Sequence, residues 1–217
     1  MTSIVESTSD AFVAGLDYLR DPRHQRVALA TYELIATGKP ARVDRIAEGA
    51  GVDIEEVEEW MSDWPAVFRD EDGAITGFFG LSVNDGFAHR FDTDEYGRAW
   101  TWCTYDPLFI AKVLGVTARV SSNCPVTGTP VTLTVTPEGV RDLDPPTAVM
   151  SMLPPDRASF RDLITTLCHF IWLFETAEAA ESWTAQNPGT FVISVDEGFE
   201  IGRRMTDQVF DSPSSPL

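Results

Sequence analysis

The chain has 217 residues, 43% of them hydrophobic and 23% charged, which suits one generous domain or two small ones without disulfide bonds. Its 34 Asp and Glu against 16 Lys and Arg give a net charge of −18, which argues against nucleic acid and anionic membrane surfaces as partners. No apolar stretch approaches the roughly 20 residues needed to cross a bilayer, and the polar start lacks the pattern of a secretion signal. We therefore expect a cytoplasmic protein whose three cysteines are reduced.

The first part of the chain predicts three helices followed by a hairpin. Gly51 ends the second helix, and Asp53 is an N-cap residue at the start of the third. This order is that of a winged helix, so we expect a winged-helix-like module over residues 1–84, with about 1–10 disordered. The predicted helices cover 27–35, 43–50 and 54–64, and the predicted strands cover 66–69 and 74–79.

The third predicted helix argues against DNA binding. In a winged helix this element would enter the major groove, but here it is acidic and carries neither Arg nor Lys, so it would repel phosphates. A packing or covering role is favoured over a transcription regulator. The acidic residues are Asp53, Glu55, Glu56, Glu58, Glu59 and Asp63.

The second part predicts an α+β core over residues 85–217, a mixed or antiparallel sheet flanked by helices, with a disordered tail at about 211–217. Thr176 and Asp196 are expected to cap the last two helices. The predicted strands cover 98–102, 117–121, 131–135, 149–153, 168–174 and 191–195, and the helices cover 107–114, 176–186 and 196–210.

Cys103 and Asp106 lie at the start of a predicted helix. Asp106 followed by Pro107 is typical of an N-cap with proline at the first helical position, which is a structural role. The same geometry brings Cys103 near the helix N-terminus, whose partial positive charge favours a thiolate. Cap hydrogen bonds lower the pKa of a carboxyl, whereas burial and a neighbouring thiolate raise it, and the sequence leaves both outcomes open.

The other two cysteines have different settings. Cys168 lies in an apolar run that predicts a buried strand, where a cysteine is often a small hydrophobic residue and His169 would face the opposite side. Cys124 lies in a predicted turn between strands. Cysteine spacings of 21 and 44 residues argue against a structural zinc site. Nothing in the sequence brings His24 or His89 to a cysteine as the base of a protease.

Several stretches together resemble one known family. They are Trp102-Cys103-x-x-Asp106, Thr117-Ala118-Arg119-Val120-Ser121-Ser122-Asn123-Cys124-x-x-Thr127-Gly128-x-Pro130-Val131, Cys168 in its apolar run, Ala180-Glu181-Ser182-Trp183, and Ile193-Ser194-Val195-x-Glu197-x-Phe199. These residues resemble the organomercurial (alkylmercury) lyases of bacterial mercury resistance, over residues 25 to 210 or so.

The resemblance implies a catalytic and mercury-binding set. In the family two cysteines and one aspartate act together, and these roles fall on Cys103, Cys168 and Asp106, with Cys124 structural. Some members have a second cysteine where His169 stands here. The implied reaction is protonolytic cleavage of the carbon–mercury bond, giving a hydrocarbon and Hg(II) held by two cysteines, without an organic cofactor. Thiolates suit soft mercury, and a nearby carboxyl can pass on a proton.

The resemblance also implies partners: an organomercurial substrate, small cytosolic thiols, and mercuric reductase as the acceptor of Hg(II). The alternative is a non-catalytic soft-metal sensor or carrier on the same scaffold. Such a protein needs the cysteines but no acid, so the presence of Asp106 favours the enzyme.

Overall fold

The structure, a computed structural model, describes residues 3–156 and 158–210 and contains two antiparallel sheets. The strands are β1 (Val67–Arg69), β2 (Ile75–Phe78), β3 (Leu81–Ser82), β4 (His89–Thr93), β5 (Gly97–Thr101), β6 (Ala118–Asn123), β7 (Pro130–Thr136), β8 (Gly139–Asp144), β9 (Val149–Met152), β10 (Leu173–Phe174) and β11 (Phe191–Ser194). The large sheet has the order β1-β2-β3-β5-β4-β6-β7-β8, and the small sheet has the order β10-β9-β11.

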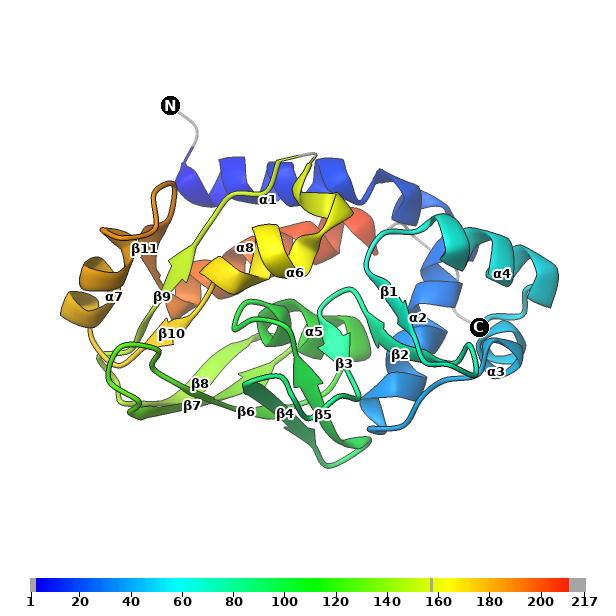
Figure 1. Ribbon diagram of the computed structural model, residues 1–217, viewed down its shortest axis with the longest axis horizontal. Helices are drawn as coiled ribbons and strands as arrows, with labels where there is room; N and C mark the ends of the chain where they lie inside the picture. The colour runs from blue at the N-terminus through cyan, green and yellow to red at the C-terminus, as the bar shows by residue number, and fades with distance from the viewer. Residues whose placement is uncertain (1–2, 157, 211–217) are drawn as a thin grey trace.

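Helices cover the large sheet in layers (Figure 1). They are α1 (Ile4–Gly15), α2 (Pro22–Ala36), α3 (Val43–Ala50), α4 (Ile54–Asp63), α5 (Asp106–Leu114), α6 (Leu163–Thr166), α7 (Ala177–Thr184) and α8 (Val195–Val209), with short 3-10 helices η1 (Asp17–Arg20), η2 (Ser159–Arg161) and η3 (Cys168–Phe170). Helix α5 packs on β6 and β7, α8 packs on α5, and α1 packs on α8. The predicted α+β class with antiparallel sheets is confirmed.

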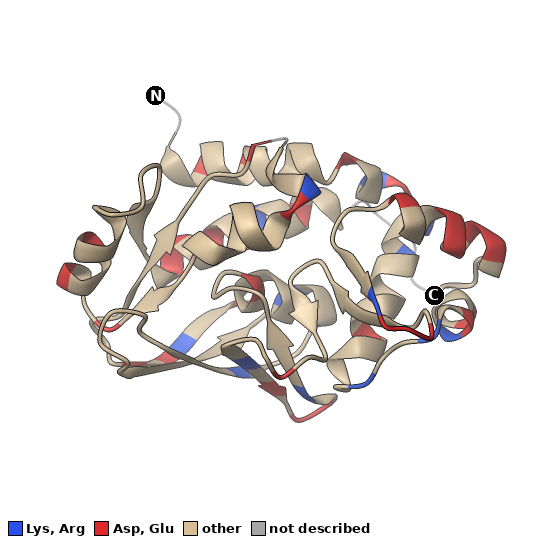
Figure 2. Cartoon of the chain, viewed as in Figure 1, with Lys and Arg blue, Asp and Glu red and all other residues tan. Residues whose placement is uncertain are grey.

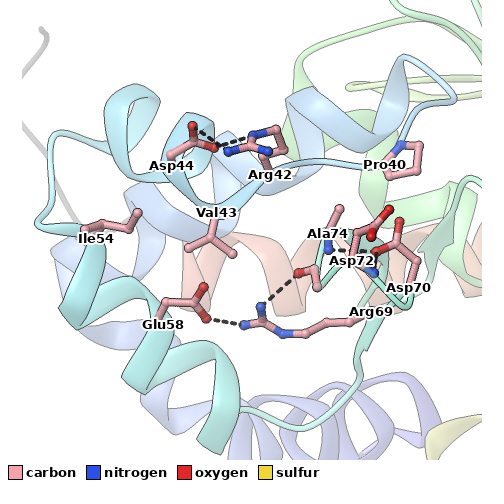
Figure 3. A pocket seen from close by; sticks show the side chains of 11 residues that line it. Pro40, Arg42, Val43, Asp44, Ile54, Glu58, Arg69, Asp70, Asp72 and Ala74 are labelled. Carbon is pink, nitrogen blue, oxygen red and sulfur yellow. Dashed lines mark hydrogen bonds and ion pairs between the residues drawn. The ribbon is translucent and has the colours of Figure 1, made fainter.

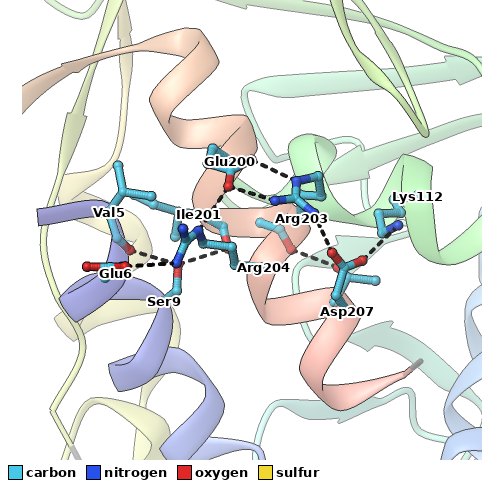
Figure 4. Close-up of polar contacts among 11 residues, drawn as sticks. Val5, Glu6, Ser9, Lys112, Glu200, Ile201, Arg203, Arg204 and Asp207 are labelled. Atoms are coloured by element: carbon cyan, nitrogen blue, oxygen red, sulfur yellow. Dashed lines mark hydrogen bonds and ion pairs between the residues drawn. The ribbon is translucent and has the colours of Figure 1, made fainter. Parts of the chain in front are cut away.

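The packing of α8 fixes the position of α5. Gly198 and Gly202 bring α8 so close that an added Cβ at Gly202 would lie 3.1 Å from the Cβ of Phe109 on α5. Ion pairs join the layers at the surface: Asp207 of α8 pairs with Lys112 of α5 at 2.9 Å (Figure 4). Helix α5 is therefore held between the sheet and α8.

Helix α1 corrects the expectation of a disordered start. Ser3 and Glu6 form a capping box, in which each side chain accepts a hydrogen bond from the other residue's backbone N–H. Glu6 also pairs with Arg204 of α8, and Ser9 Oγ donates to the Ile201 carbonyl at 3.4 Å (Figure 4). The prediction was wrong for residues 3–10 because the polar residues cap the helix while Phe12 and Val13 bury its inner face. Residues 1–2 and the predicted tail 211–217 lie outside the described residues.

The predicted helices and hairpin of the first part are present as α2, α3, α4, β1 and β2. Asp53 is the N-cap residue of α4, although its side chain makes no cap hydrogen bond. In Figure 2 much of the α4 ribbon is red, the colour that marks Asp and Glu. Strand β3 pairs with both β2 and β5, so the hairpin belongs to the same sheet as the later strands. None of the described helices is long and apolar enough to span a membrane.

Three strands of the large sheet and the N-cap of α8 differ from the sequence prediction. Strands β3, β4 and β8 were not predicted, because β3 has only two residues and β8 is a polar edge strand that only its pairing with β7 defines. Helix α8 begins after Ser194, whose side chain accepts from the N–H of Glu197 in a capping box. The prediction that Asp196 caps this helix was wrong, because Asp196 lies inside the first turn.

Candidate active site

Three side chains from two distant segments meet in the core. Cys103 Sγ, Cys168 Sγ and a carboxylate oxygen of Asp106 all lie within 4.8 Å of one another. All three residues are at most 5% exposed. Cys103 lies in the loop between β5 and α5, Asp106 is the first residue of α5, and Cys168 is in η3. The structure therefore brings together the three site residues predicted from the sequence.

The Asp106 side chain turns back toward the loop that precedes its helix. The N-cap position belongs to Tyr105, so the prediction of Asp106 as the N-cap was wrong by one residue. The Asp106 carboxylate instead accepts a hydrogen bond from the Cys103 N–H, with 2.8 Å between Oδ2 and N. Burial raises the pKa of Asp106 to about 7, although hydrogen bonds from Cys103 and the Trp102 backbone act to lower it. The carboxyl therefore exchanges its proton near neutral pH.

Gly80 makes room for this carboxyl. Its φ of +96° favours glycine, and an added Cβ would lie 2.6 Å from Cγ and 2.7 Å from Oδ1 of Asp106. The Gly80 carbonyl accepts from the Trp102 N–H at 2.9 Å, which ties the β2–β3 turn to the Cys103 loop. Gly80 is a site residue that the sequence analysis missed, because only the fold brings it against Asp106.

Cys168 is held by a short 3-10 helix. The prediction of a strand over 168–174 was wrong for its first five residues, since only 173–174 form a strand. The Ile171 N–H donates to the Cys168 carbonyl at 3.1 Å and ends the 3-10 turn. The Ile171 carbonyl in turn accepts from Thr104, from Oγ1 at 3.3 Å and from the N–H at 3.4 Å. Thr104 thus fastens the two cysteine-bearing segments to each other.

The environment of the cluster raises the pKa of both thiols, which favours their protonated forms. Burial is the main cause that raises the pKa of Cys103 well above its ordinary value, and the neighbouring Cys168 and Asp106 raise it further. The pKa of Cys168 is also raised: its interaction with the Cys103 thiol lowers it, but burial and the charge of Asp106 outweigh that effect. The cluster therefore stores protons that a thiophilic metal would displace.

The cluster borders a very small internal cavity. Its free volume for the centre of a water molecule is about 10 Å³, which is room for about one water. Phe12 of α1 forms part of its wall and stacks on Tyr105 with 4.8 Å between ring centroids. Leu163 of α6 and Leu167 close another side. Helix α1, which continues beyond the residues expected to be disordered, thus contributes a wall of the site.

The remaining candidate residues lie outside the cluster. Cys124 is buried in the turn after β6 and packs with Phe174 in a separate apolar cluster. His89 is buried with Nδ1 2.8 Å from Ser122 Oγ, and burial lowers its pKa to about 4. His24 packs against two tryptophan rings near α4, and His169 is exposed beside Cys168. No histidine joins the described cluster of ligating atoms.

A larger hollow of about 440 Å³ lies far from this chemistry, between α3, α4 and the first hairpin (Figure 3). Two ion pairs lie in its walls: Arg69 binds Glu58 at 2.8 Å, and Arg42 binds Asp44 at 3.0 Å. No cysteine lines it. The candidate site is therefore identified by its buried thiols and carboxyl and not by the volume of the pocket.

Comparison with known proteins agrees with this chemistry. The family model for alkylmercury lyases matches residues 84–207. The chain is 36% identical over 185 residues to the alkylmercury lyase of Streptomyces lividans, covering 85% of this chain and 83% of that protein. The chain belongs to the alkylmercury lyase family. A second relative, the alkylmercury lyase of Staphylococcus epidermidis, is 35% identical over 174 residues, covering 80% of this chain and 78% of that protein. The family resemblance inferred from the sequence is confirmed.

A solved structure of an alkylmercury lyase relative shares the fold. The chain matches the crystal structure of the mercury-bound form of MerB2 with a TM-score of 0.75 and 18% sequence identity. The match covers 94% of this chain and 98% of the other. At this identity the comparison concerns the fold alone.

Proposed function

We propose that this alkylmercury lyase family member cleaves the carbon–mercury bond of organomercurials, with Cys103 and Cys168 as mercury ligands and Asp106 as proton donor. The observation that carries the proposal is the meeting of two thiols and one carboxyl within 4.8 Å in a buried site. Soft thiolate sulfur is the preferred protein ligand for a soft metal such as mercury. The Asp106 carboxylate also supplies an oxygen ligand to the Hg(II) product.

The protons released and consumed in the reaction balance with this assignment. A substrate R–Hg–SR′ enters with mercury bonded to one carbon and one small thiolate. Bonds from mercury to Cys103 and Cys168 release two thiol protons. One proton leaves with the displaced small thiol, and the other passes to Asp106 and then to carbon as the carbon–mercury bond breaks. The bonding electron pair stays on carbon, so the products are R–H and Hg(II) held by two sulfurs, with no redox step.

The pKa of Asp106 suits a proton carrier. An acid or base is most effective when its pKa lies near the working pH, and burial raises that of Asp106 to about 7. A carboxyl with the ordinary pKa would be almost fully ionised at neutral pH, so it would rarely carry a proton to donate. The Cys103 N–H bond keeps the carboxyl beside the thiol while burial keeps its pKa high.

We assign Cys124 a structural role. Its N–H donates to the Thr129 carbonyl and its carbonyl accepts from the Gly128 N–H, both at 2.8 Å, in the turn between β6 and β7. Its side chain packs in an apolar cluster apart from the other cysteines.

We propose that the first part of the chain acts as a winged-helix-like covering module, with a boundary near residue 84 and a catalytic core over 85–217. Its support is the order α2-α3-α4-β1-β2 and the acidic surface of α4, which disfavours a phosphate-binding role. We further propose a cytoplasmic location, small cytosolic thiols as carriers of the substrate, and mercuric reductase as the acceptor of Hg(II). These partners are what membership of the family implies. Thiophilic Hg(II) that was left free would exchange among cellular thiols.

Benzene release from phenylmercury tests the proposed reaction. The reduced protein is incubated with phenylmercury and excess small thiol, and benzene is followed for wild type and Asp106→Ala. We expect steady release by wild type and a fall of about 100-fold or more in the variant, as for loss of a general acid. Stoichiometric binding without benzene from wild type would instead support a soft-metal carrier or sensor. Full activity of Asp106→Ala would reject only the proton donor.

A further inference from the structure

The internal cavity is too small to hold an organic group beside the cluster. Its volume of about 10 Å³ admits about one water, whereas a cavity on the order of 150 Å³ is needed for benzene. Cys103 and Asp106 are each buried, and the cavity wall includes Phe12 and Leu167. The organic group of a substrate must therefore contact the protein elsewhere before the site opens to it.

A second pocket lies on the other side of Cys168. We call it the outer pocket; its volume is about 380 Å³, and it is lined among others by Phe87, His89, Trp102, Cys168, His169 and Trp172. Trp102 and Cys168 also line the internal cavity, so these two residues separate the two spaces. Cys168 is therefore the cluster thiol that borders the outer pocket, whereas Cys103 lines the internal cavity and is not among the described residues of the outer pocket.

The lining of the outer pocket suits an uncharged aromatic ligand. Three of its residues are large aromatics, with Phe87 and Trp102 ring centroids 6.5 Å apart. His89 packs edge-on against Trp172 at 5.0 Å, and its lowered pKa of about 4 keeps it neutral. Among the residues that the structure describes, no Asp, Glu, Lys or Arg lines the pocket, although the chain has a net charge of −18. Aromatic walls bind another ring by stacking and edge-to-face contact.

We propose that the outer pocket binds the organic group of the incoming organomercurial, preferring aryl groups to methyl, before mercury bonds to Cys168. This inference rests on the proposed function. In the exchange, the Cys168 sulfur–mercury bond forms, the bond from mercury to the carrier thiol breaks, and the Cys168 proton leaves with that thiol. The aryl ring gains contact with Phe87 and Trp172, which a methyl group is too small to reach. The pocket is thus a determinant of substrate preference.

The test compares phenylmercury with methylmercury, each presented as the adduct of one small thiol. Phe87→Ala removes an aromatic wall, and Thr165→Trp fills the pocket from an exposed lining position. We expect each variant to lower kcat/KM for phenylmercury about tenfold through KM, in line with the loss of an aromatic contact, and to change methylmercury less than about twofold. Phe191→Ala is the control for Phe87→Ala, because both phenylalanines are half-buried. Thr37→Trp is the control for Thr165→Trp, because both threonines are exposed. Neither Phe191 nor Thr37 lines the pocket.

A second measurement separates this proposal from the reaction itself. In an Asp106→Asn background, capture of each mercurial is followed by intact-protein mass at short times, which requires no bond cleavage. Slower capture of phenylmercury, but not methylmercury, by the Phe87→Ala and Thr165→Trp variants supports the pocket even if wild type releases no benzene. Equal losses for the two mercurials, or equal losses in the controls, overturn the pocket proposal and leave the proposed function standing.

Discussion

The backbone N–H of Cys103 donates to Oδ2 of Asp106 at 2.8 Å, so the residue that carries one thiol also holds the carboxyl. This hydrogen bond spans three residues and closes the loop between β5 and α5. It stabilises the carboxylate, yet burial has the larger effect and raises the pKa of Asp106 to about 7. The site therefore keeps a carboxyl that is half protonated near neutral pH.

The first prediction concerns stability against pH. Because the folded pKa of Asp106 lies above its unfolded value, the unfolded state loses its proton first as pH rises. Stability is therefore unaffected at pH values below the unfolded pKa and falls as pH rises toward 7. At about 1.4 kcal/mol per pKa unit, the free energy of unfolding above pH 7 is lower by on the order of 4 kcal/mol than it is below the unfolded pKa. The site is stabilised by protonation and weakened by ionisation.

Asp106→Asn removes this ionisation and should alter the pH profile of unfolding. Between pH 5 and pH 8 we expect the free energy of unfolding, measured by urea denaturation, to fall by about 3 kcal/mol more in wild type than in the variant. The variant should also be the more stable protein at pH 8 while losing most of its benzene release. Parallel stability profiles of the two proteins would show that Asp106 does not titrate in this range.

The second prediction separates the three cysteines. Cys103→Ser and Cys168→Ser should each reduce phenylmercury turnover by about 1,000-fold or more, because one thiolate cannot replace two as ligands of a soft metal. Cys124→Ser should retain turnover per folded molecule but give less folded protein, because its side chain is 1% exposed and a hydroxyl suits an apolar cluster poorly. Benzene release and soluble yield are measured together. Turnover persisting in Cys168→Ser would mean that the second thiolate is misassigned.

The third prediction uses two glycines that have similar positive φ angles. Gly80→Ala places a Cβ against the Asp106 carboxyl and should reduce benzene release at least about 100-fold by displacing the acid. Gly97→Ala is the matched control, because Gly97 has φ +102° and nothing within 4 Å of an added Cβ. It should cost about 1 kcal/mol of stability from backbone strain and leave activity unchanged. Equal loss of activity in both variants would reject the contact with Asp106 as the cause.

The fourth prediction concerns the link between the two cysteine-bearing segments. Thr104→Val removes the hydrogen bond from Oγ1 to the Ile171 carbonyl and leaves only the longer N–H bond. We expect kcat to fall about fivefold, from the loss of about 1 kcal/mol of positioning, with phenylmercury still bound at one equivalent. Thr104→Ser keeps the hydroxyl and should restore most of the rate. Failure of serine to restore it would point to the methyl group and packing instead.

Much of the candidate site could be predicted from residue types and family likeness. The pair Cys103 and Asp106 is local in sequence, and three residues of spacing at a helix start keep them close in any fold that retains the helix. The residues around Cys168 do not indicate a functional role, since a cysteine in an apolar run is usually a core residue. Its place beside Cys103 depends on Thr104 and Ile171, a contact across 67 residues.

Helix ends and strand pairing account for the differences in the fold. Residues 3–10 were expected to be disordered because they are polar, but they cap and extend a helix that packs on α8. Strand β8 has no alternating apolar pattern, and β3 has only two residues, so both are defined by their neighbours. Cys168 to Phe170 are apolar enough for a strand but form a 3-10 turn that ends at Ile171.

The sequence by itself determined which reactive groups the protein has: three cysteines in an acidic chain, with an aspartate three residues after one of them. It also determined the family to which the chain belongs. It left open whether Asp106 holds a proton, because capping and burial shift a carboxyl pKa in opposite directions. Only the tertiary structure decided this. Asp106 is enclosed by Gly80, both thiols and the aromatic side chains of the cavity, so the cost of an unsolvated charge exceeds the gain from one hydrogen bond.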